Sequence, residues 1–122
     1  YPLVVNVVGN VDSNFAWGSE KCRINFEGNA DSFFGACVKD SEIYVRGNIG
    51  FYAFDNLTDS TVRIEGDFQS FGYNMSDNIF KTADEDLLKK LLDRENGVKP
   101  RSYNKVVFIN PDGREEVVRD YS

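Results

Sequence analysis

The first 80 residues repeat one short pattern of apolar and polar positions four times. Each copy contains a glycine, and the four glycines follow one another at intervals of 19 residues. Apolar residues stand four and two positions before each glycine and two positions after it. These columns are Val5, Ile24, Ile43 and Val62; Val7, Phe26, Val45 and Ile64; and Val11, Ala30, Ile49 and Phe68. Such alternation is typical of a strand with one buried face, and a glycine at its end favours a bend.

The constant interval predicts that the strands stack in parallel. Strands that begin in the same phase after the same number of residues can lie in register on one another, which is the arrangement of a β-solenoid. An antiparallel meander is the alternative, but its glycines would alternate between the two ends of the sheet. The pattern therefore predicts a mainly β protein, with a short parallel β-solenoid of about four 19-residue coils. The coils start near residues 5, 24, 43 and 62, with no gap in the register from Val5 to Phe80.

Two polar columns support the stacked arrangement. The glycines are Gly9, Gly28, Gly47 and Gly66, and the residues that follow them are Asn10, Asn29, Asn48 and Asp67. Stacked asparagine amides can hydrogen-bond from coil to coil, and asparagine tolerates the left-handed backbone of a bend. In the column before the glycines, Arg46 stands between Glu27 and Glu65, which predicts a favourable alternation of charge across neighbouring strands.

An aromatic column predicts a candidate binding surface. Phe33, Tyr52 and Phe71 each stand five residues after a glycine, and Tyr44 and Tyr73 are nearby in the sequence. Outward aromatic rings in a row can stack on sugars or become buried in a protein interface. The alternative is that these rings pack inside the coil or beneath the C-terminal segment.

Residues 81–122 depart from the repeat and predict a helix followed by a hairpin. The sequence TADEDLLKKLLDRENG predicts a helix with Thr82 as N-cap, Glu85 completing a capping box and Gly97 at the C′ position. Its apolar stripe consists of Leu87, Leu88, Leu91 and Leu92. The stretches from Val106 to Ile109 and from Glu115 to Val118 flank the turn sequence NPDG, which predicts a β-hairpin.

We expect this C-terminal segment to cap the solenoid, because the end of a stack leaves backbone groups and apolar interior uncovered. A separate interaction module is the alternative. At the other end, the sequence YPLVV leads directly into the first coil, and an uncapped edge favours pairing with another chain or with upstream sequence. The predicted domains are residues 1–80 for the solenoid and residues 81–122 for the helix and hairpin.

The repeat resembles that of known β-solenoids in its architecture. A 19-residue coil is similar to the repeats of large right-handed β-helical adhesins of the filamentous-haemagglutinin type, and to the short coils of bactofilin-like and phage tailspike proteins. The likeness covers residues 5–80 and consists of coil length, small residues at the corners and the asparagine column. It implies a solenoid fold and no particular functional residues.

The composition argues against several classes of function. A net charge of −6 disfavours direct binding to nucleic acid or anionic lipid, and no apolar run is long enough to span a membrane. The chain has no histidine and no phosphate-binding glycine motif. Its two cysteines, Cys22 and Cys37, can form a disulfide or stay as buried thiols. We therefore expect no cofactor, no metal site and no catalytic residues.

Carboxylates are the remaining candidates for chemistry. Asp12 with Asp31, or Glu27 with Glu65, would provide the acid pair that a glycosidase needs, but four coils offer little groove to orient a sugar. Turn aspartates are candidate calcium ligands, although solvated turn residues are the favoured interpretation. These aspartates are Asp31, Asp40, Asp55 and Asp59.

The sequence as a whole predicts a non-catalytic binding or structural module that acts through its solenoid surface or its open N-terminal edge. It would be part of an adhesin, a virion or a self-assembling scaffold. A protein partner or self-association is expected, carbohydrate is an alternative ligand, and a secreted or surface location is favoured over the cytoplasm. An acidic decoy that mimics nucleic acid or binds a basic protein is the alternative function, although Lys39, Arg46 and Arg63 interrupt its acidic columns. A carbohydrate-active enzyme is the third hypothesis.

Overall fold

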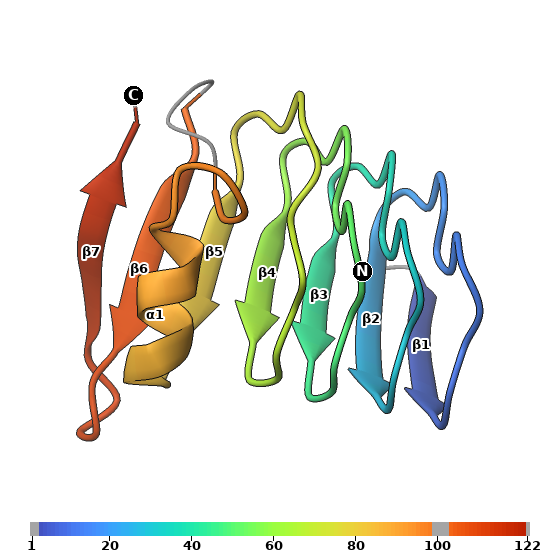
Figure 1. The fold of residues 1–122 in the computed structure, drawn as a ribbon, viewed down its shortest axis with the longest axis horizontal. Coiled ribbons are helices and arrows are strands. Elements are labelled where there is room, and N and C mark those ends of the chain that lie inside the picture. Colours follow the sequence, from blue (N-terminus) through green and yellow to red (C-terminus); the bar gives the residue numbers. More distant parts are fainter. Residues whose placement is uncertain (1–2, 99–102, 122) are drawn as a thin grey trace.

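The computed structural model describes residues 3–98 and 103–121, which form one β-sheet and one helix (Figure 1). The sheet has the strand order β1-β2-β3-β4-β5-β6-β7, with β1 to β6 parallel and β7 antiparallel to β6. The elements are β1 Leu3–Val8, β2 Cys22–Glu27, β3 Glu42–Val45, β4 Thr61–Ile64, β5 Ile79–Thr82, α1 Glu85–Leu91, β6 Lys105–Ile109 and β7 Glu115–Asp120. The predicted fold, a short parallel β-solenoid with a C-terminal helix and hairpin, is confirmed.

The coils stack with the predicted offset of 19 residues across the first four strands. Leu3 pairs with Cys22, and Glu42 pairs with Thr61. The fourth coil is shorter by one residue, since Thr61 pairs with Ile79 at an offset of 18. The predicted gapless register from Val5 to Phe80 is therefore wrong. The missing residue falls within the return segment, because Ile49 still pairs with Phe68 at 19 whereas Ala53 pairs with Phe71 at 18.

The glycine column is needed because consecutive coils approach each other closely there. A Cβ on Gly28 would stand 1.9 Å from the carbonyl oxygen of Gly9, and a Cβ on Gly66 would stand 1.8 Å from that of Gly47. Only a residue without a side chain fits such contacts. The left-handed backbone expected at the asparagines that come directly after these glycines is not found there. It occurs on the return segments instead, where one column has φ of 66° at Asn14, 61° at Phe33 and 57° at Tyr52.

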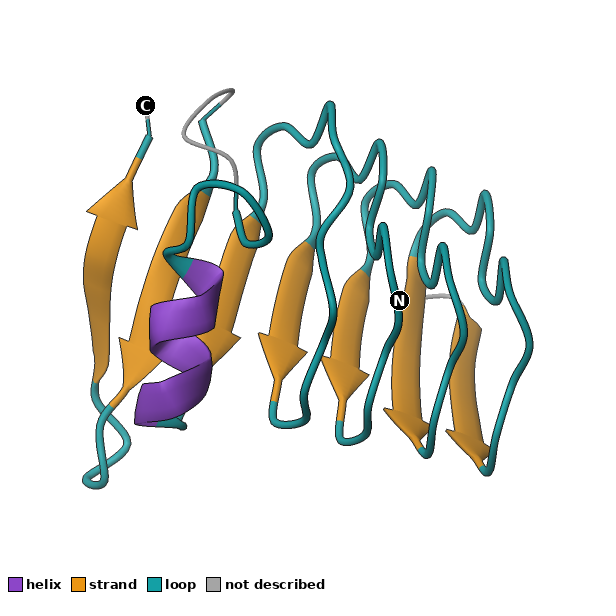
Figure 2. Cartoon of the chain, in the orientation of Figure 1, coloured by secondary structure: helices purple, strands orange, loops and turns teal. Residues whose placement is uncertain are grey.

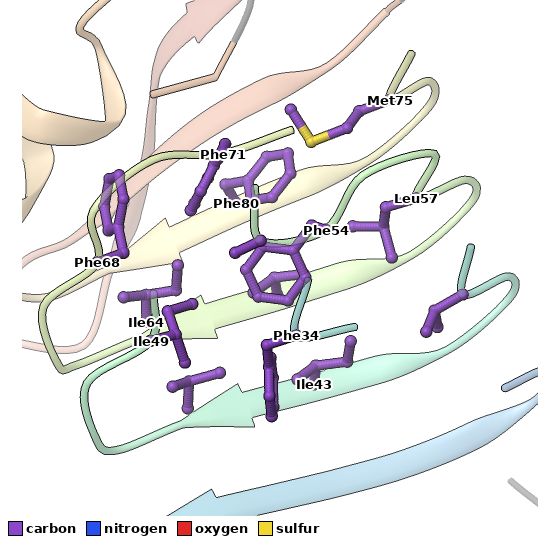
Figure 3. Close-up of a cluster of buried hydrophobic side chains, with 14 of the residues drawn as sticks. Phe34, Ile43, Ile49, Phe54, Leu57, Ile64, Phe68, Phe71, Met75 and Phe80 are labelled. Atoms are coloured by element: carbon purple, nitrogen blue, oxygen red, sulfur yellow. The ribbon is translucent and has the colours of Figure 1, made fainter. Parts of the chain in front are cut away.

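The core lies between the strands and the return segments that connect them. Inward side chains of the strands, such as Ile24 and Phe26, are buried, and so are Phe34 and Phe54 of the return segments. Figure 3 shows the phenylalanine rings of successive coils meeting in this space. The ring centroids are 6.0 Å apart for Phe34–Phe54, 5.3 Å for Phe54–Phe71 and 5.2 Å for Phe71–Phe80. The core is thus a continuous aromatic and aliphatic stack along the solenoid.

A buried polar ladder runs beside this core, at the start of each strand. Its members are Cys22, Ser41, Ser60, Asn78 and Asn104. Ser41 Oγ accepts the backbone N–H of Cys22 at 3.1 Å, and Ser60 Oγ accepts that of Ser41 at 3.1 Å. Asn78 Oδ1 accepts the N–H of Ser60 at 3.0 Å, and the chain ends on Asn104, whose Oδ1 accepts that of Asn78 at 3.2 Å. Each coil therefore satisfies a buried amide of the coil before it.

Helix α1 begins later and ends earlier than the sequence predicts. The predicted N-cap, Thr82, is wrong. The N-cap is Asp84, whose carboxylate accepts hydrogen bonds from the N–H groups of Asp86 and Leu87. Thr82 is instead the last residue of β5, where it pairs with β6. The helix ends at Leu91, so Gly97 is not its C′ residue; a Cβ on Gly97 would stand 2.3 Å from the carbonyl oxygen of Lys90.

The C-terminal segment closes one end of the core. Figure 2 shows α1 in front of the last two parallel strands, β5 and β6, and the helix residues Leu87 and Leu91 are buried. The N–H of Phe71 donates to the carbonyl oxygen of Asn96 at 2.8 Å, which ties the turn after the helix to the fourth coil. The predicted hairpin is formed by β6 and β7, and β6 also pairs in parallel with β5. The parallel sheet therefore continues beyond residue 80.

Candidate functional site: the open β1 edge

Strand β1 forms an exposed edge of the sheet. In the described part of the chain it pairs with β2 alone, so its other side presents backbone N–H and C=O groups to solvent. It contains no charged residue. Three of its apolar side chains are largely exposed: Leu3 at 54%, Val4 at 50% and Val8 at 83%. A strand edge that is both uncharged and apolar is open to pairing with another strand.

The core is also open at this end. Val5 and Val7 are only half-buried, whereas Ile24 and Phe26, the next residues of the same columns, are buried at 2% and 0% exposure. An apolar cavity of about 100 Å³ lies here, and Phe15 is part of its wall. Its lining consists of Leu3, Val5, Phe15, Ala16, Ser19, Cys22 and Ile24. Among the described residues, nothing covers the first coil in the way that each later coil is covered by its predecessor.

The outward face of β1 differs from that of the strands beside it. Val4 and Val8 point to the same side as Arg23 and Glu27, the charged residues with which they pair in β2. The outward columns of the next coils form ion pairs, with Arg23 3.5 Å from Glu42 and Arg46 3.6 Å from Glu27. Only the first coil places valines at these positions.

Two asparagine ladders end on the first coil with unused donors. Asn25 Nδ2 donates to Asn6 Oδ1 at 2.8 Å. In the second ladder, Asn29 Nδ2 donates to Asn10 Oδ1 at 3.2 Å, and Asn48 donates to Asn29 in the same way. Every amide thus donates toward the preceding coil, and the amides of Asn6 and Asn10 find no acceptor among residues 3–98 and 103–121. These amides could donate to a further strand.

The opposite edge, β7, has the character of a protected strand. It carries four charged residues in six positions: Glu115, Glu116, Arg119 and Asp120. Lys81 Nζ lies 2.8 Å from the Glu115 carboxylate, and Lys105 Nζ lies 3.9 Å from that of Asp120. Charged side chains on an edge strand oppose pairing with another sheet. The two ends of the solenoid are therefore chemically different.

The aromatic residues proposed from the sequence do not form one surface. Phe33 and Tyr52 stack with centroids 5.4 Å apart, and Trp17, which the sequence reasoning missed, extends the row at 6.2 Å from Phe33. The prediction that Phe71 belongs to this column is wrong. Because the fourth coil is one residue shorter, Phe71 pairs with Ala53 and packs in the core, where it is 1% exposed. Tyr73 is exposed on the same return side.

Tyr44 lies apart from that row, on the outer face of the sheet. The guanidinium carbons of Arg46 and Arg63 lie 5.3 Å and 4.9 Å from the centre of its ring. Both distances are within the range of a cation–π interaction. Tyr44 is therefore already engaged by two cationic neighbours.

The carboxylates of the candidate acid pairs are separately engaged or solvated. Arg46 pairs with Glu27 only, since Glu65 instead accepts from Arg63 at 2.9 Å and from the N–H of Ala83 at 3.1 Å. The offset of 19 residues keeps Arg46 in the column between Glu27 and Glu65, as expected, but Glu65 forms its ion pair with Arg63 instead of Arg46. Asp12 and Asp31 are both exposed. In the described ranges no three potential metal ligands cluster, and Cys22 and Cys37 are free thiols.

The pKa of one carboxylate, that of Asp67, is lowered from its ordinary value. The Lys90 ammonium donates to Asp67, and this hydrogen bond is the main cause that lowers the pKa of Asp67. Partial burial opposes it, while the N–H of Phe68 adds to it at 2.9 Å. Lys90 also donates to the carbonyl oxygen of Phe68 at 2.8 Å. The ion pair therefore fastens α1 to the fourth coil, which is a structural role.

Comparison of the chain with protein-family models, with curated proteins and with solved structures found no match. In the described ranges, no helix has the length and apolar character needed to cross a membrane. The class of the protein is thus defined by its fold, a β-solenoid, and the chemistry of its surface is the basis for any function.

Proposed function

We propose that this chain is a non-catalytic structural module that assembles by adding another β-strand to its β1 edge. The observation that carries the proposal is the contrast between the two edges of one sheet. β1 is uncharged and apolar, with Val8 83% exposed, whereas β7 carries four charged residues in six. An added strand would gain main-chain hydrogen bonds and would cover exposed apolar area.

The open interior supports the same proposal. An incoming strand with its own return segment would cover Val5, Val7 and Phe15 and would fill the mouth of the 100 Å³ cavity. The added strand would therefore bury Val5 and Val7 in the same way that each later coil has its inward residues buried by the coil before it. The surface therefore fits a further rung of a solenoid better than it fits a small polar ligand.

The alternative functions have less support from the surface. An acidic decoy needs continuous outward columns of acid, but Arg23, Arg46 and Arg63 interrupt those columns on the sheet. A sugar would stack on the open face of an aromatic ring. In the row of Trp17, Phe33 and Tyr52, the last two rings stack on each other, so the faces that meet in this stack are already in use.

The test is the state of association of the purified chain. Size-exclusion chromatography with light scattering, run across a wide range of protein concentration, should detect an assembly larger than 13.8 kDa. Val8→Lys places a charge on the β1 edge and should weaken that assembly at least tenfold. Val117→Lys makes the same change on β7, where the valine is also exposed at 56%, and should leave it unchanged.

A chain that stays monomeric at every concentration would overturn the proposal. An assembly that Val117→Lys disrupts and Val8→Lys does not would also overturn it, because association would then use the other edge. Circular dichroism of each variant checks that the folded state is retained.

A further inference from the structure

We infer that the strand added at the β1 edge is β1 of a second copy of this chain, paired antiparallel about a twofold axis at Asn6. The inference rests on the proposed function and names its partner. An isologous dimer uses the same patch on both subunits, so the patch must be complementary to itself. The sequence of β1 meets that requirement.

Residues 4–8 read Val-Val-Asn-Val-Val, which is the same in both directions. In an antiparallel pair centred on Asn6, Val4 faces Val8 of the second copy and Val5 faces Val7 of the second copy. Asn6 then faces Asn6 of the second copy. The strand is therefore self-complementary in this register.

The burial pattern agrees with the same register. Val5 and Val7 belong to the inward columns and are half-buried, whereas Val4, Asn6 and Val8 point outward and are exposed. Directly opposed residues of an antiparallel pair lie on the same face of the sheet. Inward valines would thus meet inward valines across the axis, and outward valines would meet outward valines.

The Asn6 amide selects the centre of the pair. Its Nδ2 group has no acceptor among the described residues, and its Oδ1, which accepts from Asn25, has a second lone pair. Two Asn6 side chains facing each other can therefore exchange hydrogen bonds. A pair centred on Val5 or on Val7 would instead place Asn6 opposite a valine, and a shift by one residue in the pairing would reverse the faces.

The twofold axis also brings the open cores together. An axis perpendicular to the sheet keeps both cores on the same side of the joined sheet, so the inward Val5 of each copy would lie beside Val7 of the other copy at the open end of the core. Charge does not oppose the contact at the joined strands, although each chain carries a net charge of −6, because β1 has no charged residue. Head-to-tail joining would instead pair β1 with the charged strand β7 and would grow without closing.

Disulfide trapping tests the register. In a background of Cys22→Ser and Cys37→Ser, Asn6→Cys places two thiols opposite each other on the axis, within the Cα separation that a disulfide requires. Mild oxidation should convert most of this variant into a covalent dimer. Val8→Cys is the matched control, since two such residues would lie about 13 Å apart along the strands and should not join.

A mixture of Val4→Cys and Val8→Cys chains provides a second measurement that leaves Asn6 intact. These positions face each other, so the mixture should yield a crosslinked heterodimer while neither variant alone crosslinks. Random collision would favour Val8→Cys alone, because Val8 is the most exposed of these residues at 83%. Crosslinking of Val8→Cys alone, without Asn6→Cys, would overturn the register.

Light scattering separates failure of this inference from failure of the proposed function. A wild-type mass twice that of the chain, lost in Val8→Lys, supports both. An assembly whose mass rises continuously with concentration, and which does not form in Val8→Lys, leaves the proposed function standing but overturns the twofold pair. A monomer at all concentrations overturns both.

Discussion

The carbonyl oxygen of Gly28 lies 1.7 Å from the point where a Cβ on Gly47 would stand. Even alanine at position 47 would therefore force two coils apart, and we expect Gly47→Ala to lower the free energy of unfolding by at least about 3 kcal/mol. Gly113→Ala is the control, since a Cβ there meets nothing within 4 Å and only its φ of 88° is strained. It should lose about 1–2 kcal/mol in urea denaturation. Equal losses would show that close stacking is not what the glycine column provides.

Removal of one hydroxyl from the buried ladder should also destabilise the fold. Ser60 Oγ accepts the N–H of Ser41 at 3.1 Å and donates to the carbonyl oxygen of Thr58 at 2.9 Å. Ser60→Ala leaves a buried amide without its acceptor, so we expect a loss of about 1–3 kcal/mol. Ser13→Ala, at an exposed position, should change stability by less than about 0.5 kcal/mol. Chemical denaturation followed by circular dichroism measures both, and a neutral Ser60→Ala would contradict the role of the ladder.

Two aromatic residues that the repeat places in one column should respond differently to truncation. Phe71 is 1% exposed within the core, so Phe71→Ala should cost about 3–5 kcal/mol of stability. Tyr52 is 45% exposed, and Tyr52→Ala should cost less than about 1.5 kcal/mol. The midpoints of urea unfolding compare the two variants directly. Similar losses would mean that the fourth coil keeps the 19-residue phase.

The ion pair between Lys90 and Asp67 should give a small stability that depends on pH. Because the pKa of Asp67 is lowered in the folded chain from its ordinary value of 3.8, the unfolded chain binds the proton more readily. The contribution is therefore present above pH 3.8 and is lost as the pH falls through the lowered folded value. Both side chains are about half exposed, so the contribution should stay below about 1 kcal/mol at neutral pH and decrease with salt.

Asp67→Asn measures this contribution, since asparagine occupies the same column in the first three coils. Thermal or urea unfolding of the two proteins from neutral to acid pH should show their difference shrinking toward zero. A difference that stays constant over this range would mean that Asp67 acts through something other than its charge.

The repeat predicted the solenoid because its columns report directly on contacts between coils. Gly28 and Gly47 stand 19 residues apart in the sequence and touch in space for that reason. The shortening of the fourth coil leaves no such mark in the sequence, since Gly66, the last glycine of the repeated column, precedes it and strand β5 contains no glycine. Phe71 was consequently assigned to an exposed column by counting from Gly66.

The other differences arise where tertiary contacts choose between local signals of similar strength. Thr82 and Asp84 both suit an N-cap, but Thr82 is used for pairing between β5 and β6, which leaves the cap to Asp84. The polar ladder did have a sequence signal, in Ser41 and Ser60 at the coil interval. It was missed because single polar residues at strand starts resemble ordinary turn residues.

The register between β2 and β3 is the same as that between β3 and β4, so residues 24–42 form an interchangeable unit of the chain. In a tandem duplication of this unit, the first copy would keep the preceding coil as its neighbour, the second copy would keep the following coil, and the two copies would pair with each other at the same offset of 19 residues. The duplication would raise the height of the stack by about 4.8 Å and leave both ends as they are. The length of this protein is therefore a quantity that insertion or deletion of whole units can adjust, independently of the edge that it presents at β1 and of the helix that closes its other end.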